Sequence, residues 1–470
     1  MDKNTEIALK IAGRVAELGG STYYVGGYVR DKILRIENKD IDIEVHGVKP
    51  AQLEAVLDEF GERVSMGESF GIYGIKGYDV DIAMPRKETN RGKGHKDFDV
   101  FVDPFIGTKS ASQRRDFTIN ALMENVLTGE IVDHWGGVQD LEKRIIRHVN
   151  DVTFAEDPLR VLRGAQFASR FEFAIAPETI ELCKNMDLGT LAPERVMGEL
   201  SKALLKANKP SIFFETLREM GQLSTWFEEM RQLIGVEQNP KYHAEGDVWN
   251  HTMMVLDSAV RYRDDGSISQ KLSFMISALT HDFGKIVATE YVNGAVHAYG
   301  HEVKGLPIIK KFLGKLTNEK AIINYATNMS KLHMKPNTMA SAKSSIKKTN
   351  QMFDDSVDPV GLICIALSDS FGQILGEGSG LPEAGANRDF LFERYEIYKE
   401  YMSRPYVMGR DLEAAGFKPG KNFREYLDYA HKLRLAGIPK NAALKQTISY
   451  ARTHKCDCLV KLVSIKSNRC

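Results

Sequence analysis

The chain has 470 residues, enough for about two to four domains, and its 43% hydrophobic and 27% charged residues are typical of a folded globular protein. Its 63 Lys and Arg balance its 63 Asp and Glu, which argues against a protein that coats nucleic acid through bulk charge. No stretch approaches the ~20 apolar residues of a membrane span, the N-terminus lacks the features of a signal peptide, and the five cysteines are too few for a disulfide framework. We therefore expect a cytoplasmic protein with no membrane partner.

The zero net charge hides an uneven distribution. Residues 301–470 hold 27 Lys and Arg against 17 Asp and Glu, a net charge of +10, so residues 1–300 carry −10. Within the basic part, 301–350 and 421–470 each carry +8, whereas 351–400 carries −7. Lys-rich helices are often simply well solvated, so these blocks by themselves favour a nucleic-acid partner no more than a solvated surface.

The first part of the chain predicts alternating helices and strands. Helices are expected over 5–18, 29–35 and 51–60, strands over 21–25, 40–48 and 131–137, and a hairpin over 70–84 with its turn at Lys76-Gly77. The polar, Gly- and Lys-rich stretch 86–100 predicts a mobile loop. After about residue 138 the strand patterns nearly vanish and helices of about 10–20 residues follow. The sequence therefore predicts a small α/β head and a long helical body.

Two adjacent glycines separate a predicted strand from a predicted helix near the start of the head. Gly26 and Gly27 allow backbone N–H groups at this turn to approach a phosphate closely. Arg30 lies one turn into the helix, within reach of the same anion. A glycine pair alone is weak evidence, because turns commonly use glycine.

Paired carboxylates follow the glycine turn. Asp40 and Asp42 share one face of a predicted strand, with Glu44 next in register. Asp81 on a second predicted strand, with Asp79 on the same face, is a third candidate. Carboxylates this close repel one another unless cations neutralise them, and Mg²⁺ held by carboxylates and a nucleoside triphosphate is the usual arrangement for phosphoryl transfer. An isolated Asp-x-Asp is usually a solvated strand edge, but the combination favours a two-metal site.

Five ordered motifs resemble those of class II tRNA nucleotidyltransferases. This family comprises the CCA-adding enzymes, their CC-adding and A-adding relatives, and bacterial poly(A) polymerases. The resemblance covers about residues 20–235. It is carried by 25–31 and 39–42, by 114–122, by Asp140-Leu141 with Arg147 followed by 156–163, and by Glu194-Arg195 with Glu199-Leu200.

The resemblance implies an α+β fold: a polymerase-beta-like nucleotidyltransferase head with a mixed β-sheet over 1–150, followed by an elongated all-α body. It implies that Asp40 and Asp42 hold two Mg²⁺ ions. Asp81 is the third catalytic carboxylate that the strand pattern predicts. The phosphate-binding and nucleotide-orienting residues that it implies in the head are Gly26, Gly27, Arg30 and Arg115.

The resemblance also implies that a helical neck over 151–235 selects the nucleotide without a template. Asp157 and Arg160, one turn apart on a predicted helix, offer an acceptor and donors for the Watson–Crick edges of C or A, and Arg163 adds a donor on the same face. An intrahelical salt-bridge ladder is the structural alternative. Two positions depart from many relatives: Arg35 stands where they have glycine, and Gln166 stands where they have a third arginine.

The body contains a second set of chemistry-bearing residues. An adjacent His-Asp pair, with a His before it and an Asp after it on separate predicted helices, suits an octahedral divalent metal in a helical bundle. These residues are His251, His281, Asp282 and Asp369, and His301 and His333 are candidates for a second metal. The set resembles the HD superfamily of metal-dependent phosphohydrolases, which implies an HD domain over 236–400 and attack on a phosphoester such as a 2′,3′-cyclic phosphate or a nucleotide. A metal-stabilised but catalytically silent helical domain is the alternative.

The predicted function is addition of CCA to the 3′ end of tRNA from CTP and ATP, with Mg²⁺ in the head and a divalent metal of unknown identity in the HD site. A basic helical tail over 401–470 is expected to contact tRNA phosphates. An enzyme that adds only A or only CC, and a poly(A) polymerase, are the nearest alternatives. A non-catalytic tRNA-binding protein and a nucleotide phosphohydrolase with a nucleotide-sensing head are alternatives from other classes. The oligomeric state stays open.

Overall fold

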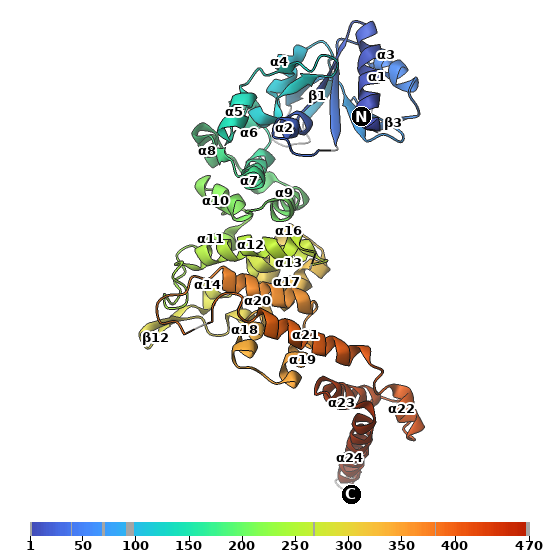
Figure 1. The fold of residues 1–470 in the computed structure, drawn as a ribbon, viewed down its shortest axis with the longest axis vertical. Coiled ribbons are helices and arrows are strands. Elements are labelled where there is room, and N and C mark those ends of the chain that lie inside the picture. Colours follow the sequence, from blue (N-terminus) through green and yellow to red (C-terminus); the bar gives the residue numbers. More distant parts are fainter. Residues whose placement is uncertain are drawn as a thin grey trace. The chain divides into compact units, whose positions relative to one another are not determined.

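A computed structural model describes residues 2–38, 40–67, 71–90, 98–266, 268–380 and 382–466 (Figure 1). The chain divides into two compact units, Met1–Arg231 and Gln232–Cys470, and each is described by itself. Within the described ranges, no helix has the length and apolar character needed to cross a membrane.

A seven-stranded sheet forms the centre of the head. Its strand order is β3-β4-β5-β2-β1-β8-β9. The strands are β1 (Ser21–Val25), β2 (Ile41–His46), β3 (Arg63–Gly67), β4 (Ile72–Ile75), β5 (Val80–Ala83), β8 (Met123–Asn125) and β9 (Ile131–Val132). The β2 and β5 strands run parallel, and the other neighbouring pairs are antiparallel. This confirms the predicted mixed sheet, including the hairpin of β4 and β5.

Helix α1 (Lys3–Glu17) packs against β1, β2 and helix α3 (Pro50–Asp58). The Asp2 carboxylate caps α1 by accepting hydrogen bonds from its first backbone N–H groups, and apolar side chains four residues apart, such as Ile7 and Ile11, are buried. In β2, the buried Ile41 and Ile43 alternate with acidic side chains. Alternation therefore turns the acidic side chains of β2 to the opposite face of the sheet from Ile41 and Ile43.

The glycine turn and its helix form as predicted. Gly26 has φ +65° and ψ −127°, a backbone conformation that residues with a Cβ rarely adopt. Helix α2 (Gly27–Ile33) begins directly after it. After α2 the chain reverses at Arg35, whose φ of +57° lies in the left-handed region. Arg35 therefore has the left-handed backbone conformation that glycine adopts without strain, and as a residue with a Cβ it pays a steric cost there.

The prediction of an irregular loop over 86–100 was wrong at both of its ends. Strands β6 (Arg86–Asn90) and β7 (Phe98–Val102) pair in antiparallel register from Arg86–Val102 to Asn90–Phe98. The intervening residues 91–97 lie outside the described residues. Strand pairing is made by backbone hydrogen bonds, so a polar composition does not prevent it.

The rest of the first unit is mostly helical. Its helices are α4 (Gly107–Gln113), η2 (Thr118–Asn120), α5 (Gly137–Lys143), α6 (Asp151–Ala155), α7 (Leu159–Phe171), α8 (Pro177–Lys184), η3 (Leu188–Thr190), α9 (Pro193–Lys206), α10 (Ser211–Glu219) and α11 (Glu228–Arg231), and a short parallel pair joins β10 (Ile145–Ile146) to β11 (Ala174–Ile175). Helix α7 packs against α9 and α10. The fully buried Phe117 touches Phe154 and Phe167 edge to face, with ring centroids 5.6 and 5.9 Å away. These aromatic contacts join the end of the head to α7.

The second unit is a helical bundle with a small hairpin. Its elements are α12 (Val248–Asp264), α13 (Lys271–Thr280), α14 (Lys285–Ala288), β12 (Glu290–Val292), β13 (Ala295–His297), α15 (His301–Lys304), α16 (Leu306–Leu316), α17 (Lys320–Leu332), α18 (Met334–Ser341), α19 (Ile346–Asp355), α20 (Pro359–Phe371) and α21 (Arg388–Ser403). Helix α13 packs against α12, α17 and α20, and its residues 273–280 are all buried. An apolar helix buried on all sides is the expected centre of such a bundle.

The C-terminal helices are α22 (Gly409–Ala414), α23 (Phe423–Leu435) and α24 (Lys440–Lys466). They have a hydrophobic core of their own, which includes the buried Leu412, Tyr426, Ala430 and Ala443. A separate core is consistent with a distinct tail. The boundaries of the four predicted domains stay predictions.

Candidate functional site

The sheet of the head brings the three predicted carboxylates together. Asp42 on β2 and Asp81 on β5 are direct register partners in the parallel pair. Asp40 lies immediately before β2, where its backbone N–H donates to the Asn38 side chain over 3.0 Å. Asp40 and Asp81 are exposed and Asp42 is half-buried, so the cluster opens to solvent.

The mutual repulsion of these carboxylates favours binding of a cation between them. Burial raises the pKa of Asp42 above its ordinary value, Asp81 and Asp40 raise it further, and Arg115 opposes them. A carboxylate whose neighbours favour its protonation is one that a bound cation would stabilise in its charged form. Three carboxylates are also the hard oxygen ligands that Mg²⁺ takes.

Arg115 lies between the carboxylate strand and the glycine turn. Its Nη2 is 3.6 Å from Oε2 of the buried Glu44, which also contacts His46 Nε2 over 2.9 Å. A Cβ at Gly26 would lie 3.3 Å from Arg115 Nη1. Glycine fits this position for two reasons: it tolerates the positive φ, and without a Cβ it leaves room for the Arg115 guanidinium. The anchoring role of Glu44 was not predicted, although its register with Asp40 and Asp42 placed it on the same face.

Arg30 lies in the interior of the head, with 4% of its surface exposed. Its Nε donates to Asp31 over 2.7 Å and its Nη1 donates to Asn120 over 2.5 Å. Its guanidinium carbon is 5.2 Å from the ring centroid of Phe167 and 4.8 Å from that of Phe171. These contacts hold the guanidinium within the protein, and direct binding of a triphosphate by Arg30 stays a prediction.

The predicted helical placement of Asp157 was wrong, because α7 begins at Leu159, after Asp157 and Pro158. The Asp157 carboxylate accepts from Leu159 N over 3.1 Å and from Arg195 Nη2 over 2.9 Å. The residue before a proline is disfavoured in the α region, so Pro158 keeps Asp157 out of the helix, which periodicity alone does not reveal. Asp157 therefore connects the start of α7 to α9, which carries Arg195.

The two arginines of α7 contact groups outside their own helix. Arg160 donates to the backbone carbonyls of Thr153 (2.6 Å) and Arg114 (2.8 Å). Arg163 makes a two-pronged ion pair with the buried Asp116 carboxylate, with Nε and Nη2 2.7 and 2.6 Å from Oδ2. These partners replace the intrahelical salt-bridge ladder, and they place both guanidinium groups between the head and α7.

Gln166 faces the interior on the same helix. It is 3% exposed, and its Nε2 has no hydrogen-bond partner within the part of the chain that the structure describes. A buried amide donor without a partner is costly. The exchange of arginine for glutamine noted in the sequence therefore affects a buried position and not the solvated face of α7.

The body brings all six predicted residues of its metal site together. They come from separate segments: His251 on α12, His281 and Asp282 after α13, His301 at the start of α15, His333 between α17 and α18, and Asp369 on α20. Two groups of three have ligand atoms within 4.8 Å of one another, namely His251, His281 and Asp369, and Asp282, His301 and His333. The carboxylates join the groups, because His251 Nε2 lies 3.0 Å from Asp369 Oδ1 and 3.5 Å from Asp282 Oδ2.

The imidazoles of this cluster are oriented by hydrogen bonds from Nδ1. The Nδ1 atoms of His281, His301 and His333 donate to the backbone carbonyls of the residues three positions earlier, over 2.9, 2.8 and 2.6 Å. This leaves each Nε2 for the centre, where the Nε2 atoms of His301 and His333 are 3.3 Å apart. The buried His251 Nε2, His281 Nε2 and Asp282 Oδ1 make no well-formed hydrogen bond among the described residues. Oriented imidazoles whose Nε2 atoms converge on a carboxylate fit a divalent metal.

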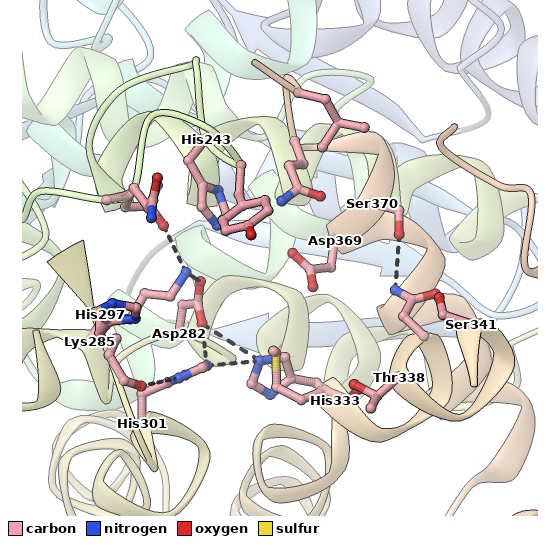
Figure 2. A pocket seen from close by; sticks show the side chains of 18 of the residues that line it. His243, Asp282, Lys285, His297, His301, His333, Thr338, Ser341, Asp369 and Ser370 are labelled. Carbon is pink, nitrogen blue, oxygen red and sulfur yellow. Dashed lines mark hydrogen bonds and ion pairs between the residues drawn. The ribbon is translucent and has the colours of Figure 1, made fainter. Parts of the chain in front are cut away.

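A cavity of about 630 Å³ opens onto this cluster (Figure 2). Asp282, His301, His333 and Asp369 line one part of it, and Lys285 Nζ is 2.7 Å from Asp282 Oδ2. Although burial raises the pKa of Asp282, Lys285 and His281 hold it well below the usual range. Lys285 was not predicted as part of the site, although it follows the His-Asp pair by three residues.

The comparisons with known proteins support both the family resemblance and the fold. Residues 22–147 match the family model of the poly A polymerase head domain. The chain is 34% identical over 385 residues to the multifunctional CCA protein of Pasteurella multocida (strain Pm70), covering 80% of this chain and 88% of that protein. Its fold is similar to that of the Thermotoga maritima CCA-adding enzyme complexed with tRNA-CCA (TM-score 0.63, 20% identity, 96% of each chain). It is also similar to that of the Bacillus stearothermophilus CCA-adding enzyme in complex with CTP (TM-score 0.63, 21% identity, 97% of this chain and 100% of that chain). The predicted fold class is thereby confirmed.

Proposed function

The chain belongs to the family of the multifunctional CCA proteins, and we propose that it adds C and A nucleotides to the 3′ end of tRNA from CTP and ATP without a template. The observation that carries the proposal is the pairing of Asp42 with Asp81 beside the turn at Gly26 and Arg115. This arrangement places carboxylates for metal ions next to a cationic group for a triphosphate.

Asp40, Asp42 and Asp81 are proposed to hold Mg²⁺ in the head. When bound, the metal activates the attacking 3′-hydroxyl and neutralises charge on the leaving pyrophosphate. Arg115, held by Glu44, orients the triphosphate against the backbone of the turn at Gly26 and Gly27. The protein thus contributes mainly positioning and electrostatic stabilisation.

Selection of C and A is proposed to lie at the start of α7. Asp157 offers acceptor oxygens and Arg160 a fork of donors, the set needed to read a Watson–Crick edge. Their present partners, Arg195 and two backbone carbonyls, hold both side chains in place. Arg163 is tied to Asp116 and supports this arrangement.

The test of this function uses three primers: tRNA lacking CCA, tRNA ending in CC, and an oligo(A) primer, each with CTP, ATP or both. We expect three nucleotides to be added to the first primer, one A to the second, and no long extension of the third. Addition stopping at CC, addition of A only, or long A tails would assign the chain to one of the alternative activities. Absence of any addition would favour the non-catalytic tRNA-binding alternative.

A second activity is favoured by the imidazoles that converge in the body, where His251 Nε2 and His281 Nε2 make no well-formed hydrogen bond among the described residues. We propose an HD domain in which His251, His281, Asp282 and Asp369 bind a divalent metal, with His301 and His333 available for a second one. When bound, the metal supplies a nucleophile from water and polarises a phosphoester such as a 2′,3′-cyclic phosphate or a nucleotide. The cavity beside the cluster has the size of a small-ligand site.

The test is the phosphodiesterase rate of a His281→Ala/Asp282→Ala variant against the parent chain on a 2′,3′-cyclic nucleotide. Loss of hydrolysis in the variant is expected. Identical rates would contradict the catalytic proposal, and measurable metal binding by the parent would then favour the silent, metal-stabilised domain. The cytoplasmic location and the contact of the basic tail with tRNA also stay predictions.

A further inference from the structure

The geometry points to Glu245 as a positioning residue of the metal site in the body, which fixes the metal ligand His251 and the cavity-wall residue His243 at the same time. The inference rests on the proposed metal site and deepens it. Glu245 precedes α12 and was not among the predicted site residues.

The Glu245 carboxylate lies at the centre of three hydrogen bonds. Its Oε1 accepts from His243 Nδ1 over 2.8 Å and from His251 Nδ1 over 3.0 Å. Its Oε2 accepts from the backbone N–H of Ile374 over 2.8 Å. The side chain is 1% exposed, so water does not compete for these bonds.

The contact with His251 sets which ring nitrogen is available to a metal. When Nδ1 of the neutral ring donates to Glu245, Nε2 is the nitrogen left for a metal, and it lies 3.0 Å from Asp369 Oδ1. A carboxylate behind a metal-bound imidazole fixes the ring and raises its basicity. Gly372 O is a weaker alternative acceptor, 3.2 Å from the same Nδ1.

The contact with His243 extends the arrangement to the cavity. His243 lines the cavity (Figure 2), and its ring meets that of His251 edge to face with centroids 4.9 Å apart. One oxygen of Glu245 therefore orients a ring of the metal cluster and a ring of the cavity wall.

Glu245 also connects two loops that flank the site. The loop before α12 pairs with the loop after α20 through Ala244 N to Ile374 O (2.8 Å) and Gly376 N to Lys241 O (3.1 Å). The helix α20 carries Asp369, and α12 carries His251. The bond from Ile374 to Glu245 thus connects the carboxylate to the segment that follows Asp369.

The acceptor count explains why a neutral isostere cannot replace Glu245. Three N–H donors converge on the side chain, and a carboxylate offers two acceptor oxygens. Glutamine offers one oxygen and one NH₂ group, so at least one of the three N–H donors would face another donor. Glu245→Gln therefore preserves the volume and removes the hydrogen-bond pattern.

The experiment titrates Co²⁺ into the metal-free, full-length chain carrying Asp40→Asn/Asp42→Asn/Asp81→Asn, so that the head carboxylates do not contribute. The visible absorption of Co²⁺ reports both its affinity and its ligand geometry. In this background we expect Glu245→Gln to raise the Kd by about 10- to 100-fold and to change the absorption spectrum. The control is Asp354→Asn, which alters a carboxylate that accepts from His431 over 2.8 Å in the same unit and does not line the cavity.

Weaker binding and an altered spectrum in Glu245→Gln alone would support the positioning role. Equal Kd values and spectra in the parent and Glu245→Gln would overturn it while leaving the metal site in place. If the parent itself binds no Co²⁺, the metal site fails, and this inference fails with it. Should Glu245→Gln not fold, Glu245→Asp, which keeps the charge but is too short to reach all three donors, is judged by the same outcomes.

Discussion

The two candidate metal sites of this chain differ in ligands and in burial. The head cluster consists of carboxylates, with Asp40 and Asp81 exposed to solvent. The body cluster is rich in histidine, and His251 and His281 are completely buried. Oxygen-only ligands at a surface suit Mg²⁺ that enters with a nucleoside triphosphate. Buried, oriented imidazoles suit a transition metal that stays in the protein.

The two sites also differ in how the chain assembles them. In the head, strand alternation and one register pair, Asp42 with Asp81, align the carboxylates. In the body, five separate segments converge, and hydrogen bonds from each Nδ1 fix the rings. The geometry of the head site is therefore set by the register of two strands, and the geometry of the body site is set by the packing of the bundle.

The largest expected effect comes from the head carboxylates. Asp42→Asn should lower the rate of nucleotide addition by about 10³-fold or more, because a bound metal contributes several kcal/mol of transition-state stabilisation. The measurement is initial-rate incorporation of CTP into tRNA lacking CCA. The exposed Asp58→Asn at the end of α3 is the matched control and should behave as the parent does. Equal rates for Asp42→Asn and the parent would exclude this cluster as the active site.

The next effect distinguishes a structural from a phosphate-binding Arg30. Arg30→Met leaves the buried Asp31 without its main partner and should lower the free energy of unfolding by about 3–5 kcal/mol. Thermal or denaturant unfolding checks this, with Arg14→Met, whose side chain is 42% exposed, as control. An unchanged stability together with a raised KM for CTP would instead identify Arg30 as a direct ligand of the triphosphate.

The third prediction tests whether Glu44 holds Arg115 in position for binding the nucleotide. Glu44→Gln loosens Arg115 and should raise the KM for CTP by about tenfold with a smaller change in kcat, the pattern of weakened substrate binding. Steady-state kinetics measure it, and Glu62→Gln, which alters an exposed pair with Lys76, serves as the control. A KM that changes in Arg115→Gln and not in Glu44→Gln would show that Arg115 needs no anchor.

The smallest effect concerns the turn after α2. Arg35→Gly should stabilise the first unit by about 1 kcal/mol, because glycine adopts the φ of +57° without steric cost. Arg35→Ala keeps the strained backbone and is the matched control, with no gain expected. The measurement is the melting temperature of the parent, Arg35→Gly and Arg35→Ala. Equal stabilisation by alanine and glycine would assign the effect to loss of the arginine side chain and not to the backbone conformation.

Much of the head could be predicted from sequence because its signals are local. The alternation of Asp42 and Glu44 with Ile41 and Ile43 determines one strand face, and a glycine pair determines the turn before it. The pairing of β6 with β7 was missed because β6 is polar throughout, and the backbone hydrogen bonds that hold it leave no hydrophobic alternation in that strand. Asp157 was placed on a helix because periodicity alone does not detect an N-cap proline.

The site in the body was predictable in its ligands and not in what supports them. His251, His281, Asp282 and Asp369 stand out because histidine is scarce, with 12 in the chain, and because the four residues form an ordered pattern. Glu245 is tied to a segment far along the chain, because the backbone N–H of Ile374 donates to it over 2.8 Å. Such a tertiary contact has no signature in the spacing of a single sequence. Lys285, by contrast, lies three residues after Asp282 and 2.7 Å from its Oδ2, so its spacing was visible in the sequence and was not used.

The separation of the two sites is tested most directly by sizing the products of two variants on tRNA lacking CCA, with CTP and ATP present. The prediction is that Asp42→Asn leaves the tRNA unextended, whereas His281→Ala/Asp282→Ala extends it by three nucleotides and stops, as the parent does. Extension by Asp42→Asn, or loss of extension in the His281→Ala/Asp282→Ala chain while it remains folded, would contradict the assignment of CCA addition to the carboxylates of the head.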